Sequence, residues 1–410
     1  MKTRMSSWLA LPLLLLTGCP SGGGGDGGFG VGGTGVAYVV NTGPNEISAY
    51  TTDVVGALRD AGTVALADVP SSIAVSSDSA FAFIGTNDGV YAFRVNSATG
   101  GLSSVSGSPF SPGNSVTALT VSSNNRFLYA VNNNDTVSAY TINASTGILA
   151  LVGAPSAVGT TPSGVAVSPN GSFLYVSNQG SNSVSAFRVD GTTGALTFEE
   201  NELAGTAPSG VAVMASGSNS FLYVSNQGSD NVSAFTINGT TGALTGVGAP
   251  VAAGTAPSGV AVMASGSDSF LYVSNQGSDN VSAFTINGTT GALTGVGAPV
   301  AAGTAPSGVV VSPNGSFLYV SNQGSDNVSA FTINGTTGAL TGVGAPVAAG
   351  TTPSGITIEP DGQFLYVSNS SGGGNVSGYR ITAGTGALVS LGSAFPSGGS
   401  PVGIATPGRP

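Results

Sequence analysis

The sequence predicts an all-β chain that folds as an eight-bladed β-propeller, a closed ring of four-stranded sheets. Three observations carry this prediction. A unit of about 47 residues recurs along the chain, four short strand-like segments fit within each unit, and the C-terminal tail repeats only the first of the four.

The repeat is clearest in the segment Phe173-Leu-Tyr-Val-Ser-Asn178. Eight copies place an aromatic residue at the same point, namely Tyr38, Phe83, Tyr129, Tyr175, Tyr223, Tyr272, Tyr319 and Tyr366. Two copies, 205–253 and 254–302, differ only by Asn219 against Asp268, which indicates a tandem duplication.

Each unit alternates strand-like segments with turn residues, as residues 205–253 illustrate. A small apolar first strand is expected at 210–213, bulkier second and third strands at 221–225 and 232–237, and a Gly-rich fourth strand over 244–251. A small first strand suits the crowded centre of a ring. All 11 tyrosines lie in second or third strands, which predicts that they form the core between blades.

The two ends of the chain predict how the ring closes. The repeats begin at Val36 in a second strand, and the tail at 401–405 matches a first strand with no second strand after it. We expect the tail to complete blade one, which would remove an exposed sheet edge. Seven blades remain the alternative if a degenerate early unit forms none.

Composition excludes several kinds of chemistry. The 410 residues include 66 glycines, no histidine and one cysteine, Cys19. Catalytic triads with histidine and His-ligated zinc or haem are therefore excluded. Without the first 18 residues, six arginines face 18 acids, a formal charge of −12. Because nucleic-acid binding depends on Lys and Arg, nucleic acid is excluded as a partner.

The N-terminus predicts an exported lipoprotein. Lys2 and Arg4 precede an apolar run, Trp8 to Leu16, which is too short to span a bilayer. Leu16-Thr-Gly-Cys19 resembles the lipobox of bacterial lipoproteins, which implies a signal peptide over 1–18 and lipidation of Cys19. Residues 19–35 then form a Gly-rich tether to a propeller over 36–410. Pro20 favours the outer membrane or cell surface as the destination.

The repeated segments also resemble a known family. The segments Leu174-Tyr-Val-Ser-Asn178, Pro208-Ser-Gly-Val-Ala-Val213 and Thr240-Thr-Gly-Ala-Leu244 are similar to those of the lactonase-like and YVTN β-propellers. The resemblance spans about 36–405. It implies a propeller fold, seven blades as a rule, and in some members hydrolysis of sugar-acid lactones. It carries over no active-site residue, since this chain lacks histidine.

Acidic residues recur in the loops between second and third strands. These loops share one face, called the top, with the loops that lead into the first strands. The expected acidic rim on this face consists of Glu46, Asp88, Asp135, Asp230, Asp279 and Asp326. Such carboxylates are candidates for binding calcium or a cationic partner. The simpler interpretation is that Asp and Asn stand there as hairpin-turn residues.

Together these features predict a monomeric, lipid-anchored propeller that binds a protein or glycan on its top face without catalysis or a cofactor. Because the tether begins a second strand on the bottom face, the top face should point away from the membrane. One alternative is a lactone hydrolase that uses Glu46, Asp88 or Asp135. Another is an accessory propeller of an envelope complex.

Overall fold

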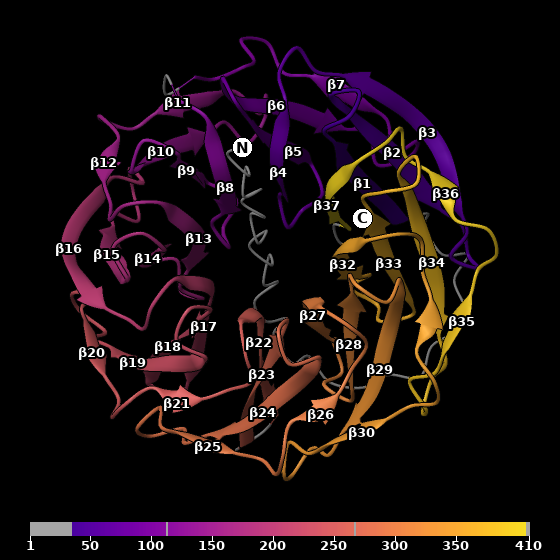
Figure 1. Ribbon diagram of the computed structural model, residues 1–410. Helices are drawn as coiled ribbons and strands as arrows, with labels where there is room; N and C mark the ends of the chain where they lie inside the picture. Colours follow the sequence, from indigo (N-terminus) through magenta and orange to yellow (C-terminus); the bar gives the residue numbers. More distant parts are fainter. Residues whose placement is uncertain (1–34, 112–113, 266–267, 407–410) are drawn as a thin grey trace, which may run out of the picture.

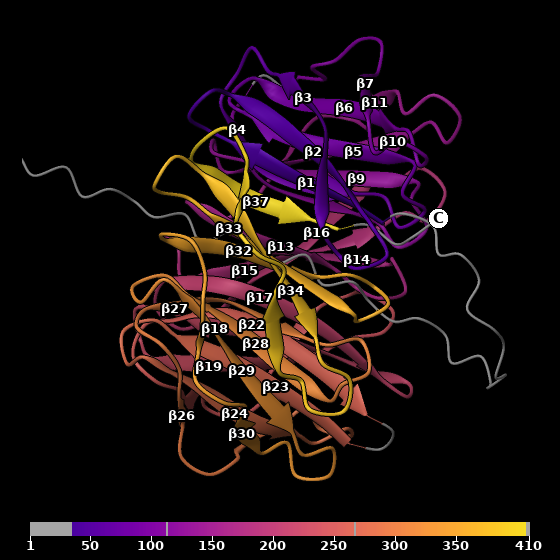
Figure 2. The same ribbon diagram turned by 90° about the vertical axis from the view of Figure 1, so that its right-hand side faces the viewer.

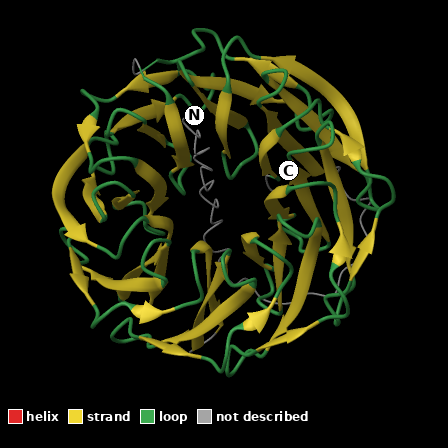
Figure 3. Ribbon diagram, in the orientation of Figure 1, coloured by secondary structure: helices red, strands yellow, loops and turns green. Residues whose placement is uncertain are grey.

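A computed structural model describes residues 35–111, 114–265 and 268–406, and these form strands, turns and loops without a helix (Figure 3). Eight antiparallel sheets surround a central axis (Figure 1). The chain is therefore an eight-bladed propeller, and the seven-bladed alternative is wrong. The N-terminal segment 1–18, Cys19 and residues 20–34 of the tether lie outside the described residues.

Blades one to four contain the less repetitive half of the ring. From the axis outward, blade one has the order β37-β1-β2-β3, and the next three follow chain order. Their strands are β1 (Gly35–Asn41), β2 (Glu46–Thr52), β3 (Leu58–Ala65), β4 (Pro70–Val75), β5 (Phe81–Thr86), β6 (Gly89–Val95), β7 (Leu102–Ser104), β8 (Val116–Val121), β9 (Phe127–Asn132), β10 (Thr136–Ile142), β11 (Leu149–Leu151), β12 (Ser156–Ala157), β13 (Pro162–Val167), β14 (Phe173–Asn178), β15 (Ser183–Val189) and β16 (Leu196–Leu203).

Blades five to eight repeat one plan, and the tail supplies the last strand. Their strands are β17 (Pro208–Ser216), β18 (Asn219–Asn226), β19 (Asn231–Ile237), β20 (Leu244–Gly246), β21 (Val251–Ala252), β22 (Pro257–Ser265), β23 (Asp268–Asn275), β24 (Asn280–Ile286), β25 (Leu293–Gly295), β26 (Val300–Ala301), β27 (Pro306–Val311), β28 (Phe317–Asn322), β29 (Asn327–Ile333), β30 (Leu340–Gly342), β31 (Val347–Ala348), β32 (Pro353–Ile358), β33 (Phe364–Asn369), β34 (Asn375–Ile381), β35 (Leu388–Ser390), β36 (Phe395–Pro396) and β37 (Pro401–Ala405).

The fourth strand differs from the prediction in five blades. In blade five the segment expected as one strand over 244–251 is two short strands, β20 and β21, which both pair with β19. The intervening residues include Gly248 in a left-handed conformation, φ 65°, and Pro250, which has no N–H to donate. The outer edge is consequently broken, which hinders pairing with other chains.

The ring closes as predicted. Strand β37 pairs antiparallel with β1, with Tyr38 opposite Ala405 and Val39 opposite Ile404. Figure 2, a view from the side of the ring, shows the C-terminal strand β37 beside β1. The first and last parts of the chain thus share blade one. Strand β37 is its innermost strand, so β1 is paired on both sides.

The two faces of the ring follow from the strand order. The top carries the loops from second to third strands and from each blade into the next, and the bottom carries the other turns. Strand β1, the second strand of blade one, starts on the bottom face at Gly35.

Neighbouring blades are clamped by a repeated aromatic contact near the bottom. The tyrosine of one second strand donates its hydroxyl to the carbonyl of a glycine in the outer turn of the next blade, as Tyr175 does to Gly242 at 2.9 Å. Gly242 has φ 82° and lies against the ring of Phe173, so a side chain at this position would collide with that ring. Six of the eight joints carry the bond: Tyr38–Gly100, Tyr175–Gly242, Tyr223–Gly291, Tyr272–Gly338, Tyr319–Gly386 and Tyr366–Gly56.

The other two joints use arginine. Blade two has Phe83 in place of the tyrosine, and the buried Tyr129 hydroxyl of blade three has no hydrogen-bond partner among the described residues. At these joints Arg94 donates to the Ser145 carbonyl, and Arg126 donates to the Gly191 and Thr192 carbonyls at 3.0 Å. All eight joints therefore have a hydrogen bond from one blade to a carbonyl in the outer turn of the next blade, donated by a tyrosine in six joints and by an arginine in two.

The core lies between the blades, as the aromatic pattern predicts. Ten of the 11 tyrosines are buried; the exception is Tyr91 on the third strand of blade two. No helix within the described residues is long and apolar enough to cross a membrane.

Candidate functional site

Four of the six predicted rim acids occupy equivalent places on the top face. Asp135, Asp230, Asp279 and Asp326 each end the turn between second and third strands in a left-handed conformation, φ 53–61°. Asp and Asn tolerate this conformation better than other residues with a side chain. The left-handed conformation of the turn therefore accounts in part for the acids at these positions, which agrees with their interpretation as hairpin-turn residues.

The carboxylates of these four acids hold the loop into the next blade. Asp230 Oδ1 accepts a hydrogen bond from the Ala256 backbone N–H at 2.8 Å. In each of the four cases the residue that donates its backbone N–H directly precedes the proline that opens the next first strand. The other pairs are Asp135–Thr161, Asp279–Ala305 and Asp326–Thr352, at 2.7–2.8 Å. In blade four Asn182 makes the same bond to Ala207. An amide replaces the acid there, so this position requires an acceptor and not a charge.

Glu46 and Asp88 do not belong to that set, and the expected alignment is wrong for both. In blade one Asn45 has the left-handed conformation, φ 53°, and Glu46 lies one residue later as the first residue of β2. In blade two the hairpin between Thr86 and Gly89 contains only Asn87 and Asp88, so Asp88 lies in a shorter turn than Asp230. The six acids therefore do not form a regular rim.

Serine hydroxyls at the centre of the top face are also committed to structure. In six blades the first strand opens with a proline followed by a serine that donates to a carbonyl of the next first strand, as Ser163 does to Pro208 at 3.0 Å. The same kind of bond joins Ser71–Val116, Ser209–Pro257, Ser258–Pro306, Ser307–Pro353 and Ser354–Pro401. These hydroxyls link the innermost strands, and among the described residues the hydrogen bonds recorded for them go to backbone carbonyls and to other serines and not to a base.

Blade two carries a polar pair that sequence reasoning missed. Tyr91 stands where Ser233 stands in blade five, and its hydroxyl donates to Asp68 Oδ2 at 2.9 Å. Asp68 lies in the loop from blade one, at the place of Thr206 in blade five. The signal in the sequence is that both positions depart from the repeat consensus, and the prediction that every tyrosine belongs to the core between blades does not hold for Tyr91.

The surroundings of Tyr91 keep its phenol protonated. Burial, the hydrogen bond to Asp68 and the nearby charges of Asp68 and Asp88 all raise the pKa of Tyr91. At neutral pH the hydroxyl therefore donates to Asp68 and keeps its own oxygen as an acceptor. Asp68, Asp88 and Tyr91 interact with one another, and Glu46 lies on the same face in blade one; the repeat explains none of the four, and we call them the blade 1–2 patch.

The charges are distributed unequally between the two faces. Seven acids lie on the top, namely Glu46, Asp68, Asp88, Asp135, Asp230, Asp279 and Asp326. The five arginines of the described part of the chain all lie at the bottom ends of strands or in bottom turns, namely Arg59, Arg94, Arg126, Arg188 and Arg380. The top face is consequently a negative surface that attracts positively charged groups.

The acids of the top face do not converge on a metal site. Within 35–111, 114–265 and 268–406, no group of three or more Asp, Glu, Cys or His side chains is placed to hold an ion. The four latching acids are distributed one to a blade, each bonded to its own loop. Calcium binding stays a prediction that these residues do not support.

The fold and its top face define an eight-bladed propeller with one irregular polar patch. The sequence matches the family described as "Lactonase, 7-bladed beta-propeller" over residues 102–213, 209–306 and 298–405, and no curated protein matches it. The chain belongs to this lactonase propeller family and has one blade more than the family description states.

Solved structures share the fold at low sequence identity. The periplasmic gluconolactonase PpgL of Pseudomonas aeruginosa has 18% identity and a TM-score of 0.61, over 92% of this chain and all of its own. A Bacteroides fragilis protein proposed to be a 6-phosphogluconolactonase has 21% identity and a TM-score of 0.62, over 91% of this chain and 98% of its own. A functionally unknown protein of Desulfotomaculum acetoxidans has 16% identity and a TM-score of 0.56, over 92% and 100%.

Proposed function

We propose that the chain is an exported, lipid-anchored propeller that binds a partner on its top face and does not catalyse a reaction. One observation carries this proposal: from Asp135 to Asp326, the carboxylates that a hydrolase could recruit are bonded to backbone N–H groups of the next loop. A general base must reach a proton of the substrate or of water, and these carboxylates are held by their loops instead.

The charge of the top face favours a protein partner with basic side chains. Seven acids and none of the described arginines lie on that face, and a negative surface accelerates association with positive partners. The blade 1–2 patch is the specific part of this surface, because its residues have no copy in blades five to seven. A neutral glycan would not depend on these charges, and an accessory role in an envelope complex would use the same face.

A lactone hydrolase is the second candidate, favoured by the family and by the Tyr91–Asp68 hydrogen bond. In such a reaction Asp88 would accept a proton from water, whose oxygen bonds to the lactone carbonyl carbon. The ring carbon–oxygen bond then breaks, and the leaving oxygen takes up a proton. Asp88 is the acid best suited to this role, since it is exposed and lies outside the set of latches.

Binding is tested by chemical crosslinking on intact cells of the bacterium that carries the chain. The variant E46Q/D68N/D88N removes the charge of the blade 1–2 patch and leaves every latch in place. The control D60N/E199Q/D268N removes three acids of the outer strands and the bottom face. We expect the crosslinked partner to be lost from the first variant and retained by the control. Equal retention by both variants would contradict the proposed docking face.

Lipid anchoring is tested by labelling the expressed chain with radioactive palmitate. The expected result is label in the intact chain and none in Cys19→Ala, which should leave the membrane fraction. Label that persists in the variant, or a chain that never enters the membrane fraction, would contradict the anchor.

A further inference from the structure

Two blades have an outer strand that runs without interruption. In the other six blades no outer strand exceeds three residues, whereas β3 (Leu58–Ala65) and β16 (Leu196–Leu203) have eight each. Strand β16 is the outermost strand of blade four (Figure 1), and it contains no counterpart of Gly248 or Pro250. A long outer strand presents a row of backbone groups to which another strand can be added.

The ladder between β15 and β16 shows which backbone groups of β16 face outward. Its register is regular over 200–203, and directly after β16 the Ala204 N–H donates to the Asn182 carbonyl at 2.9 Å. Because hydrogen-bonded and non-hydrogen-bonded pairs alternate along an antiparallel ladder, the N–H and C=O groups of Asn201 and Leu203 point away from β15. These groups are directed to the place where a further strand would lie.

One face of β16 carries large apolar side chains that the blade does not require. Phe198 and Leu203 lie on the face directed at blade three, where the ring of Phe198 meets that of Phe187 edge-on, with 5.6 Å between ring centres. The two residues are nevertheless 49% and 74% exposed. At the corresponding positions blade five has only Gly246 and Ala252, so packing within the blade does not explain the larger side chains.

The other face of β16 carries two carboxylates without a cation. Glu200 and Glu202 both face blade five, where Glu200 accepts the backbone N–H of Leu244. Arg188 pairs with the neighbouring Glu199 at 3.4 Å, and the ion pairs of the described residues include neither Glu200 nor Glu202. Burial and the charge of Glu200 raise the pKa of Glu202. A positive side chain placed beside this face would therefore stabilise both carboxylates.

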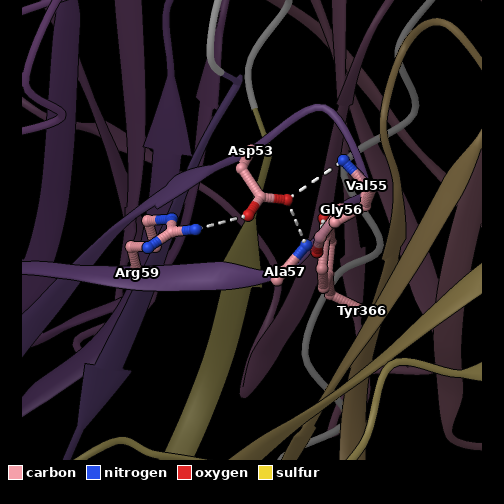
Figure 4. Close-up of polar contacts among 6 residues, drawn as sticks. All are labelled: Asp53, Val55, Gly56, Ala57, Arg59 and Tyr366. Carbon is pink, nitrogen blue, oxygen red and sulfur yellow. Dashed lines mark hydrogen bonds and ion pairs between the residues drawn. The ribbon is translucent and has the colours of Figure 1, made fainter.

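The second long outer strand, β3, does not combine these features. It begins beside a turn in which Asp53 accepts the Val55 N–H at 3.0 Å and pairs with Arg59 at 2.9 Å (Figure 4). The edge therefore carries charges of both signs. Gly62 interrupts the middle of β3 with φ 107°, and Val64 is half-buried. Strand β3 is thus a matched comparison of equal length for β16.

We infer that the free edge of β16 binds an extended segment of another protein in which basic and apolar side chains alternate. The segment would pair with the outward backbone groups of Asn201 and Leu203. Its apolar side chains would cover Phe198 and Leu203, and its lysines or arginines would lie beside Glu200 and Glu202. A second copy of the chain fits poorly, because two paired β16 strands would bring their glutamates together. This site is separate from the proposed top-face partner and does not depend on it.

Hydrogen–deuterium exchange of the full chain, followed by mass spectrometry, tests this pairing. The probe is a short synthetic peptide that alternates lysine with valine, and the control peptide alternates glutamate with valine. We expect the lysine peptide to slow amide exchange over 196–204 and to leave exchange over 58–66, which contains β3, unchanged. The glutamate peptide should slow neither. Equal protection of both outer strands, or protection of neither, would contradict the inference.

Two variants of β16 separate backbone pairing from charge. Leu203→Pro removes one outward N–H and leaves the ladder with β15 in place, so it should weaken peptide binding about tenfold. Its matched control is Ala65→Pro, the equivalent outward position of β3, which should change nothing. Glu202→Lys should reverse the preference, so that the glutamate peptide binds more tightly than the lysine peptide.

Three results would overturn the inference. Binding that survives Leu203→Pro, or a preference for lysine that survives Glu202→Lys, would contradict pairing at this edge. Loss of peptide binding in E46Q/D68N/D88N would place the peptide on the top face, whereas we expect this variant to bind as the unmodified chain does. A dimer that forms without peptide and dissociates in Leu203→Pro, measured by sedimentation, would assign the edge to a second copy.

Discussion

The hydroxyl of Tyr366 in blade eight donates to the carbonyl oxygen of Gly56 in blade one at 2.8 Å, across the joint where the two ends of the chain meet. The same bond occurs between copies in the middle of the chain, for example from Tyr223 to Gly291 at 3.0 Å. The closing joint therefore uses the side-chain contact of the repeat in addition to the pairing of β37 with β1.

Removing this hydroxyl should weaken the ring at its closure. Tyr366→Phe leaves the Gly56 carbonyl without its donor, which we expect to lower the free energy of unfolding by about 1 kcal/mol. The control is Tyr129→Phe, because the buried Tyr129 hydroxyl has no partner to lose among the described residues. Urea unfolding at equilibrium measures both. A larger loss in the control would show that this hydroxyl does not clamp the blades.

The top-face latch should depend on an acceptor and not on charge. Asp279→Asn should change the midpoint of thermal unfolding little, because Asn182 makes the equivalent bond in blade four. Asp279→Ala loses the bond to Ala305 and leaves alanine at φ 56°, at a cost of about 2 kcal/mol. Calorimetry of the two variants distinguishes them, and equal losses would refute the latch.

Stability should be lost in alkali and not near neutral pH. Burial raises the pKa of Tyr50, Tyr140 and Tyr379 to about 12 in the folded chain, against 10.0 for an ordinary tyrosine. The folded state therefore holds its phenolic protons more tightly, and this stabilisation is complete below pH 10 and is lost as the pH rises toward 12.

The measurement is the urea midpoint as a function of pH. Because the chain has no histidine, the midpoint should be flat between pH 6 and pH 9 and should fall above pH 10. A steep change between pH 6 and pH 8 would mean that some other buried group titrates there.

The near-identical copies should be exchangeable. Deleting residues 254–302 joins Ala253 to Gly303 and leaves Tyr223 to face Gly338 in place of Gly291. We expect a folded seven-bladed ring that still closes through β37, with a lower urea midpoint because each blade must rotate further. Circular dichroism and small-angle scattering check the fold. An unfolded or oligomeric product would show that the joints do not tolerate the change in curvature.

The repeat made the fold predictable, since four β-patterned segments in eight copies leave few architectures, and the unpaired tail at 401–405 specified the closure. The split fourth strand was not foreseen, because Gly248 and Pro250 interrupt pairing through their backbone conformation while the apolar pattern continues. The candidate site was predicted less well. Counting residues aligned Glu46 and Asp88 with Asp230, but in blade one the equivalent residue is Asn45, in a turn of the same length, and in blade two the hairpin is two residues shorter.

Tyr91 shows why the polar patch escaped notice. Its residue type matches the core tyrosines, and only its register opposite Ile84 places it where the repeat has serine. The bond to Asp68 depends on a loop from the neighbouring blade, a contact that no pattern within one unit reveals. Side chains that break a repeat at two positions joined in space are therefore better markers of function than those that follow it.

The rate of hydrolysis of sugar-acid lactones by the purified chain, measured with and without calcium, tests the central claim most directly. If the polar side chains of the ring serve its joints and a docking face, the chain and its Asp88→Asn and Asp68→Asn variants will all hydrolyse lactones at the rate of buffer. Turnover by the unmodified chain that disappears in Asp88→Asn would contradict this account and establish a hydrolase.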